Sequence, residues 1–206
     1  MVFDADGTLL DTREFILKAY EHALAAYGYT VPDRTFIREH MGLSLQDCYR
    51  AFAPDGDNKA LCDLHHTYQI NNLALIDSYE GLLLTLDTLR DARLKIAICS
   101  ARHGLLIDAL TRVGIKDHCD AIVGGLDVTK HKPDPEGFLK VCEMISVSPE
   151  AAVMVGDTPQ DIGAGKNGGA AFTIGVTHGF GTREALIEAG ADHVVDRLAD
   201  IPAIIS

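Results

Sequence analysis

Residues 151–157 read Ala-Ala-Val-Met-Val-Gly-Asp, a short apolar run that ends abruptly in a glycine and an acidic residue. Three further runs share this pattern, at 94–99, 121–123 and 172–176, and each is followed by a polar residue or by glycine. Unbroken apolar runs of this length are typical of strands buried on both faces of a parallel sheet. Helix-length segments such as 105–113 and 135–145 separate them. Residues 80–206 therefore predict a doubly wound, parallel α/β sheet.

Residues 12–79 have a different hydrophobic pattern. Apolar side chains recur there with helical spacing, most clearly in the stripe of Phe15, Ile16, Ala19, Tyr20, Ala23, Leu24 and Tyr27. Further helices are expected at 34–40, 45–52 and 59–73, and no strand is expected. The sequence therefore predicts an all-helical domain, 12–79, inserted between the two parts of an α/β domain, 1–11 and 80–206. Interfaces between domains often hold small-molecule sites.

The chain of 206 residues is acidic, with 18 basic and 30 acidic residues and a formal net charge of −12. This balance argues against nucleic-acid binding, which needs a basic surface. The five cysteines form no C-x-x-C pair, so we expect reduced, mostly buried thiols.

The expected location is the cytoplasm, with no membrane partner, because no apolar run spans a bilayer and residues 1–4 show no signal peptide. The oligomeric state is left open, since the apolar residues of 12–79 can face the α/β domain or a second subunit.

Several polar residues follow the ends of the expected strands, where ligands bind in parallel α/β sheets. They are Asp4 and Asp6 after the first apolar residues, Ser100 after 94–99, Asp157 after 151–156, and Lys132 in a loop before a helix. Three carboxylates, a hydroxyl and a lysine at one sheet edge suit a hard divalent cation and a phosphoryl group. A carboxylate can attack phosphorus to form an aspartyl-phosphate, and a second carboxyl group can protonate the leaving oxygen.

Four motifs occur in order along the chain: 4–8 (Asp-Ala-Asp-Gly-Thr), Ser100 at a strand end, Lys132-Pro133, and Gly156-Asp157 with Asp161. In these residues the chain resembles the haloacid dehalogenase superfamily of phosphohydrolases. The resemblance implies a Rossmann-like core and identifies the helical insertion with the C1 cap of that family. The segments 176–181 and 189–192 are most similar to its phosphoglycolate phosphatase branch.

The resemblance also implies roles for individual residues. Asp4 would be the nucleophile and Asp6 the acid and base, while Ser100, Ala101 and Lys132 would bind the phosphoryl group. Mg²⁺ would be held by Asp4, the backbone carbonyl of Asp6 and Asp157, with Asp161 as a ligand or a support. The residues around Asp161 favour a structural role as well, because Thr158-Pro159-Gln160-Asp161 is close to a capping box.

The expected activity is Mg²⁺-dependent hydrolysis of a small phosphorylated metabolite. Phosphoglycolate is the first candidate, inorganic pyrophosphate the second and β-phosphoglucomutase-like phosphotransfer the third. A non-catalytic phosphate sensor is the alternative from another class, but a sensor has no need of both Asp4 and Asp6.

Candidate substrate contacts are Arg38, His40, His103 and His178. The chain departs from the family pattern at 101–103, where Ala-Arg-His stands in place of the more usual Asn-Lys.

Overall fold

The structure is a computed structural model that describes residues 1–40, 43–102 and 104–205. The chain divides into two compact units. The α/β unit comprises Met1–Asp11 and Asp77–Ser206, and the helical unit comprises Thr12–Ile76.

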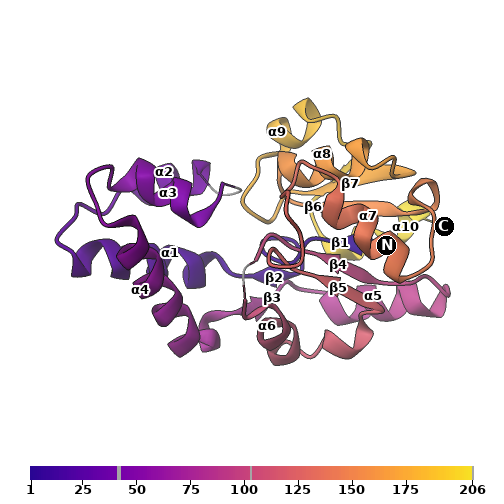
Figure 1. The fold of residues 1–206 in the computed structure, drawn as a ribbon. Coiled ribbons are helices and arrows are strands. Elements are labelled where there is room, and N and C mark those ends of the chain that lie inside the picture. The colour runs from indigo at the N-terminus through magenta and orange to yellow at the C-terminus, as the bar shows by residue number, and fades with distance from the viewer. Residues whose placement is uncertain (41–42, 103, 206) are drawn as a thin grey trace. The chain divides into compact units, whose positions relative to one another are not determined.

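The α/β unit contains a six-stranded sheet in the order β5-β4-β1-β6-β7-β8, in which all neighbouring strands are parallel (Figure 1). The strands are β1 (Val2–Phe3), β4 (Ala97–Cys99), β5 (Ala121–Val123), β6 (Val153–Gly156), β7 (Phe172–Val176) and β8 (His193–Val195). The helices are α5 (Leu82–Asp91), α6 (Leu106–Arg112), α7 (Glu136–Met144), α8 (Pro159–Asn167), α9 (Arg183–Glu188) and α10 (Pro202–Ile205). Short 3₁₀ turns lie at η2 (Lys116–His118), η3 (Pro149–Ala151) and η4 (Leu198–Asp200). The predicted doubly wound parallel sheet is confirmed.

Both faces of this sheet are buried at its central strands. Successive strand residues point to opposite faces, and Val2 and Phe3 of β1 both have no exposed surface. Val2 packs into a cluster with Phe138 and Val141 of α7. On the other face, Ile98 of β4 is likewise fully buried. This two-sided burial explains why the strands read as unbroken apolar runs.

The shortest strand of the sheet, β1, lies at its centre. Val2 pairs with Ala97 of β4 on one side and with Met154 of β6 on the other. Residue Asp4, which follows β1 directly, therefore lies in the middle of the carboxyl edge of the sheet.

A second, two-stranded antiparallel sheet joins β2 (Leu10–Asp11) to β3 (Asp77–Ser78). The prediction of no strand in 12–79 is wrong at Asp77–Ser78, and the boundary between the units falls after Ile76. A two-residue strand has no periodicity, and its pairing depends on a partner far away in the sequence. The partly exposed strand β8 was not predicted for a similar reason, since its residues form no buried apolar run.

The helical unit contains α1 (Arg13–Ala26), α2 (Arg34–Glu39), α3 (Leu45–Phe52), α4 (Asn58–Asn71) and the turn η1 (Leu73–Leu75). Helix α4 packs against both α1 and α3. The N-cap residues Asp33, Ser44 and Asp57 each accept a hydrogen bond from a backbone N–H of the helix that follows. The predicted helices of this region are confirmed, although Tyr27 at the end of the apolar stripe is 50% exposed.

All five cysteines lie in the described part of the chain, and all are free thiols, four of them buried. The prediction of unpaired, mostly buried cysteines is confirmed. Among the described residues, no helix has both the length and the apolar character needed to cross a membrane.

Candidate active site

Asp4 and Lys132 form the centre of the site. The backbone N–H of Asp4 donates to the carbonyl of Val155 at 2.8 Å, which extends the pairing of β1 with β6 by one residue. Lys132 Nζ donates to Asp4 Oδ1 at 2.5 Å and also to Asp161 Oδ1. The same ammonium donates to the carbonyl of Cys99 at the end of β4 at 3.1 Å. Lys132 thus joins the ends of two strands to the first turn of α8.

The loop after Asp4 turns sharply at Gly7. Gly7 has a φ of +84°, in the left-handed region, and its N–H donates to the carbonyl of Leu10 at 2.9 Å. A Cβ atom at this position would lie 2.3 Å from Asp157 Oδ2, so glycine is needed for conformation and for space. The turn brings Thr8 Oγ1 to Asp157 Oδ1, to which it donates at 2.8 Å.

Asp157 follows β6 and is completely buried. Its second oxygen, Oδ2, accepts the backbone N–H of Phe180 at 2.8 Å, so both carboxylate oxygens have a fixed donor. A Cβ atom on the neighbouring Gly179 would lie 2.2 Å from Asp157 Oδ2. The sequence did not indicate either donor. Thr8 belongs to the first motif but had no assigned role, and Phe180 acts through its backbone, which leaves no side-chain signal.

The two carboxylate oxygens of Asp161 accept hydrogen bonds from different residues. Oδ2 accepts the backbone N–H of Thr158 at 3.0 Å and the Thr158 hydroxyl at 2.6 Å, so the expected capping box of α8 is confirmed. Oδ1 accepts from Lys132. The capping contact therefore orients the oxygen that faces the site.

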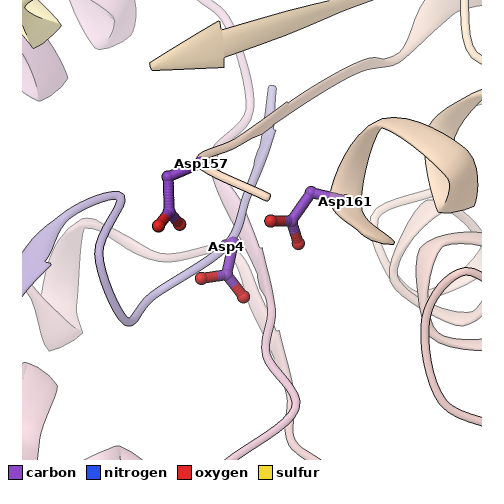
Figure 2. A group of neighbouring side chains, drawn as sticks. All are labelled: Asp4, Asp157 and Asp161. Atoms are coloured by element: carbon purple, nitrogen blue, oxygen red, sulfur yellow. The ribbon is translucent and has the colours of Figure 1, made fainter. Parts of the chain in front are cut away.

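Three buried carboxylates converge here. Figure 2 shows the carboxyl groups of Asp4, Asp157 and Asp161 close to one another, and each offers an oxygen within 4.8 Å of an oxygen of each of the other two. Burial raises the pKa of Asp4 well above its usual range, and burial together with the charge of Asp161 raises the pKa of Asp157 to about 7. Burial alone would lower the pKa of Lys132, but the charges of Asp161 and Asp4 outweigh it and raise that pKa.

Burial is the first cause of the raised pKa values of Asp4 and Asp157, and in this buried site three carboxylates face one ammonium, which leaves an excess of negative charge. A hard divalent cation would relieve this excess, and carboxylate oxygens are the ligands that such cations prefer. The donor set of Asp4, Asp157 and Asp161 therefore fits a hard divalent cation.

The residues predicted to bind phosphate also lie together. Ser100 is buried, and its backbone N–H donates to the carbonyl of Val123 at 2.9 Å. Ser100, Ala101 and Lys132 line one small pocket. The other residues that line it are Cys99, Val123, Val128, Lys130, His131 and Gly137.

The carboxylate of Asp6 faces Arg102. Arg102 Nε donates to Asp6 Oδ2 at 2.9 Å, and Arg102 Nη2 donates to Asp6 Oδ1. The sequence did not indicate this pair. It marked 101–103 as a departure from the family pattern, but two residues 96 positions apart in the chain carry no sign of contact. The contribution of Asp6 to a cation was expected from its backbone carbonyl and stays a prediction.

Of the candidate substrate contacts, His178 belongs to the α/β unit. Its Nε2 lies 2.9 Å from the carbonyl of Thr8 and its Nδ1 lies 3.2 Å from the carbonyl of Asp196. Its ring also packs on Tyr79 with a centroid distance of 4.0 Å. This ring therefore braces the loop that carries Thr8, which is a structural task.

The other three candidate contacts stay predictions. Arg38 and His40 belong to the helical unit, where Arg38 is exposed on α2 and His40 Nδ1 lies 2.8 Å from the carbonyl of Phe36. His103 lies outside the described residues.

The chain is similar to known proteins in sequence and in fold. Residues 1–175 match the haloacid dehalogenase-like hydrolase family. A Clostridium perfringens protein named as a candidate pyrophosphatase, PpaX, is 34% identical over 206 residues, which are 98% of this chain and 94% of that protein. The crystal structure of a predicted phosphatase from Clostridium acetobutylicum has a TM-score of 0.86 at 26% identity, covering 99% of this chain and 96% of that one. A predicted phosphoglycolate phosphatase from Haemophilus somnus has a TM-score of 0.92 at 22% identity, covering 100% and 96%, and this likeness concerns the fold alone.

Proposed function

Because the chain belongs to the haloacid dehalogenase-like hydrolase family and is a phosphatase, we propose that it is Mg²⁺-dependent and acts through an aspartyl-phosphate. The observation that carries this proposal is the buried group of Asp4, Asp157 and Asp161 around Lys132 at the carboxyl edge of the sheet. Such a group binds a cation and a phosphoryl oxygen side by side.

Asp4 is the proposed nucleophile. One of its carboxylate oxygens forms a bond to phosphorus while the bond from phosphorus to the leaving oxygen breaks, and the carboxyl group of Asp6 gives that oxygen a proton. In the second half, the carboxylate of Asp6 takes a proton from water. The water oxygen bonds to phosphorus, and the bond from Asp4 to phosphorus breaks. Lys132 and Ser100 hold the oxygens of the transferred group in both halves.

Asp4, Asp157 and the backbone carbonyl of Asp6 are the proposed ligands of Mg²⁺. When bound, this ion reduces the repulsion between the nucleophile and the phosphoryl oxygens. Thr8 and Phe180 keep Asp157 in one orientation for this purpose. Because one oxygen of Asp161 caps α8 and the other pairs with Lys132, we assign Asp161 a supporting role.

Inorganic pyrophosphate is the substrate that we place first, and phosphoglycolate second. This reverses the order expected from the sequence motifs. The reason is the names of two relatives, from Clostridium perfringens and Listeria welshimeri, which are 34% and 29% identical to this chain. Both carry the pyrophosphatase name, and this chain covers 94% and 95% of their lengths. The phosphoglycolate phosphatase named above is similar in fold only.

The test is turnover of p-nitrophenyl phosphate, pyrophosphate and 2-phosphoglycolate with and without Mg²⁺. We expect Asp4→Asn to lower kcat by at least about 10³-fold and to abolish a phosphorylated peptide containing Asp4, detected by mass spectrometry after acid quenching. Asp200→Asn, which alters an exposed ion pair of the same unit, is the control and is expected to keep full activity.

Full activity of Asp4→Asn would refute the nucleophile. Activity that is the same in a chelator as in Mg²⁺ would refute the metal dependence, and an inactive wild-type protein would refute the substrate class.

A further inference from the structure

Arg102 is a buried cation that the proposed reaction does not use. Its side chain is only 6% exposed, against 19% for its partner Asp6. Burying an ion pair costs desolvation energy that the attraction between the charges often fails to recover, so fold stability alone gives a weak reason for it. Placed this close to the proposed phosphate-binding residues, Arg102 calls for a functional explanation.

Arg102 lies where the leaving group of a bound substrate is expected. Its backbone N–H donates to Ser100 Oγ at 3.1 Å, which ties it to a proposed phosphate ligand. Its guanidinium contacts Asp6, the residue proposed to protonate the leaving oxygen. A substrate whose phosphoryl group lies at Ser100 and whose leaving oxygen faces Asp6 therefore brings its leaving group to Arg102.

The geometry of the pair shows which chemistry Arg102 recognises. The guanidinium presents Nε and Nη2 together to the two oxygens of one carboxylate. This fork can bind a substrate carboxylate or a phosphoryl group, because both offer two oxygens to the parallel N–H donors. Such a group also brings negative charge next to Asp6, and the repulsion between like charges favours the departure of Asp6 from the fork.

From these contacts, and resting on the proposed function, we propose that Arg102 binds a second anionic group of the substrate and exchanges Asp6 for it. The protein then selects compounds in which a phosphoryl or carboxylate group adjoins the scissile phosphate. The same exchange releases the Asp6 carboxylate from its ion pair, so that it can take up a proton from water and carry it to the leaving oxygen. Binding of the second anion to Arg102 and release of Asp6 for catalysis are thus coupled.

The test compares three substrates. Pyrophosphate carries a second phosphoryl group, 2-phosphoglycolate carries a carboxylate, and ethyl phosphate has a methyl group in place of that carboxylate. Arg102→Met removes the charge and the fork, whereas Arg102→Lys keeps the charge and loses the fork. Arg197→Met is the matched control, because Arg197 also binds one carboxylate with Nε and Nη2, that of Asp200, but is 73% exposed.

We expect Arg102→Met to lower kcat/KM for the doubly anionic substrates by about 10–100-fold, mainly through KM, as for the loss of a charged hydrogen bond. Activity toward ethyl phosphate is expected to stay within about threefold or to rise. For the doubly anionic substrates, the kcat/KM of Arg102→Lys is expected to lie between those of the wild type and Arg102→Met. Arg197→Met is expected to have the kcat/KM of the wild type. A selective loss for pyrophosphate alone identifies a phosphoryl group as the second anion, and one for 2-phosphoglycolate alone identifies a carboxylate.

An equal loss for all three substrates, or no loss for any, would overturn the inference. A wild-type protein that hydrolyses ethyl phosphate as well as the other two would also overturn it, while leaving the proposed phosphatase mechanism intact. A wild-type protein inactive toward all three would instead refute the proposed substrate class, and this inference with it. Urea unfolding of each variant separates these outcomes from a loss of folding.

Discussion

Asp157 makes the stability of the metal-free protein depend on pH. Burial, reinforced by the charge of Asp161, raises its pKa in the folded state from 3.8 to about 7. The folded protein therefore binds this proton more tightly than the unfolded chain does. The resulting stabilisation is complete below about pH 4 and is lost as pH rises through about 7.

The size of the effect follows from the proton count. Between the two pKa values, folding takes up nearly one proton at Asp157, which corresponds to a loss of about 1.4 kcal/mol per pH unit. From pH 5.0 to pH 6.5 the free energy of unfolding therefore falls by about 2 kcal/mol on account of Asp157.

Urea unfolding in the presence of a chelator at these two pH values measures the effect. Asp157→Asn carries no titrating group, so its stability should fall by about 2 kcal/mol less than that of the wild type. The control Asp200→Asn should follow the wild type. Mg²⁺ added at pH 6.5 should stabilise the wild type and not Asp157→Asn. Parallel pH profiles for the wild type and Asp157→Asn would refute the reasoning.

Two further substitutions, each with a control, test the buried charges and the tight packing of the site. Lys132→Met leaves two buried carboxylates without their cation and should cost about 3–5 kcal/mol, whereas Lys59→Met removes an exposed ion pair and should cost less than about 1 kcal/mol. Equal costs in urea unfolding would contradict the burial argument. Gly179→Ala places a Cβ atom 2.2 Å from Asp157 Oδ2 and should lower kcat/KM by about 10²-fold. Gly114→Ala, at a φ of +77° with open space around it, should cost stability only, and equal activity losses for the two glycine variants would contradict the contact.

The parts of the site that could be predicted from the sequence are those at strand ends. Asp4, Ser100 and Asp157 each follow an apolar run, and a parallel sheet brings the carboxyl ends of its strands to one edge. That rule needs neither side-chain conformations nor knowledge of the loops. It therefore predicted the grouping of these residues, once the apolar runs had indicated a parallel sheet.

The contacts that were not predicted depend on side-chain reach and on loops. The ion pair of Arg102 with Asp6 joins two loops whose approach follows only from the assembled sheet. Phe180 holds Asp157 through its backbone N–H, which any residue except proline would supply. The pairing of β2 with β3 involves two residues on each side and no hydrophobic pattern.

The central place of β1 means that the site and the sheet come into existence together during folding. Val2 and Phe3 have their strand partners at 97–98 and 154–155, so the centre of the sheet closes only when segments far apart in the sequence meet. Closing such long loops is slow, because their conformational entropy is lost before the contacts form. The contacts of the helical unit close shorter stretches of chain, since even α1 and α4, which pack together, both lie within Thr12–Ile76. Recovery of activity after denaturation would thus report the closing of the sheet. Partial unfolding at β6 would separate β1 from one of its two strand partners, and it would displace Asp157 from the site at the same time.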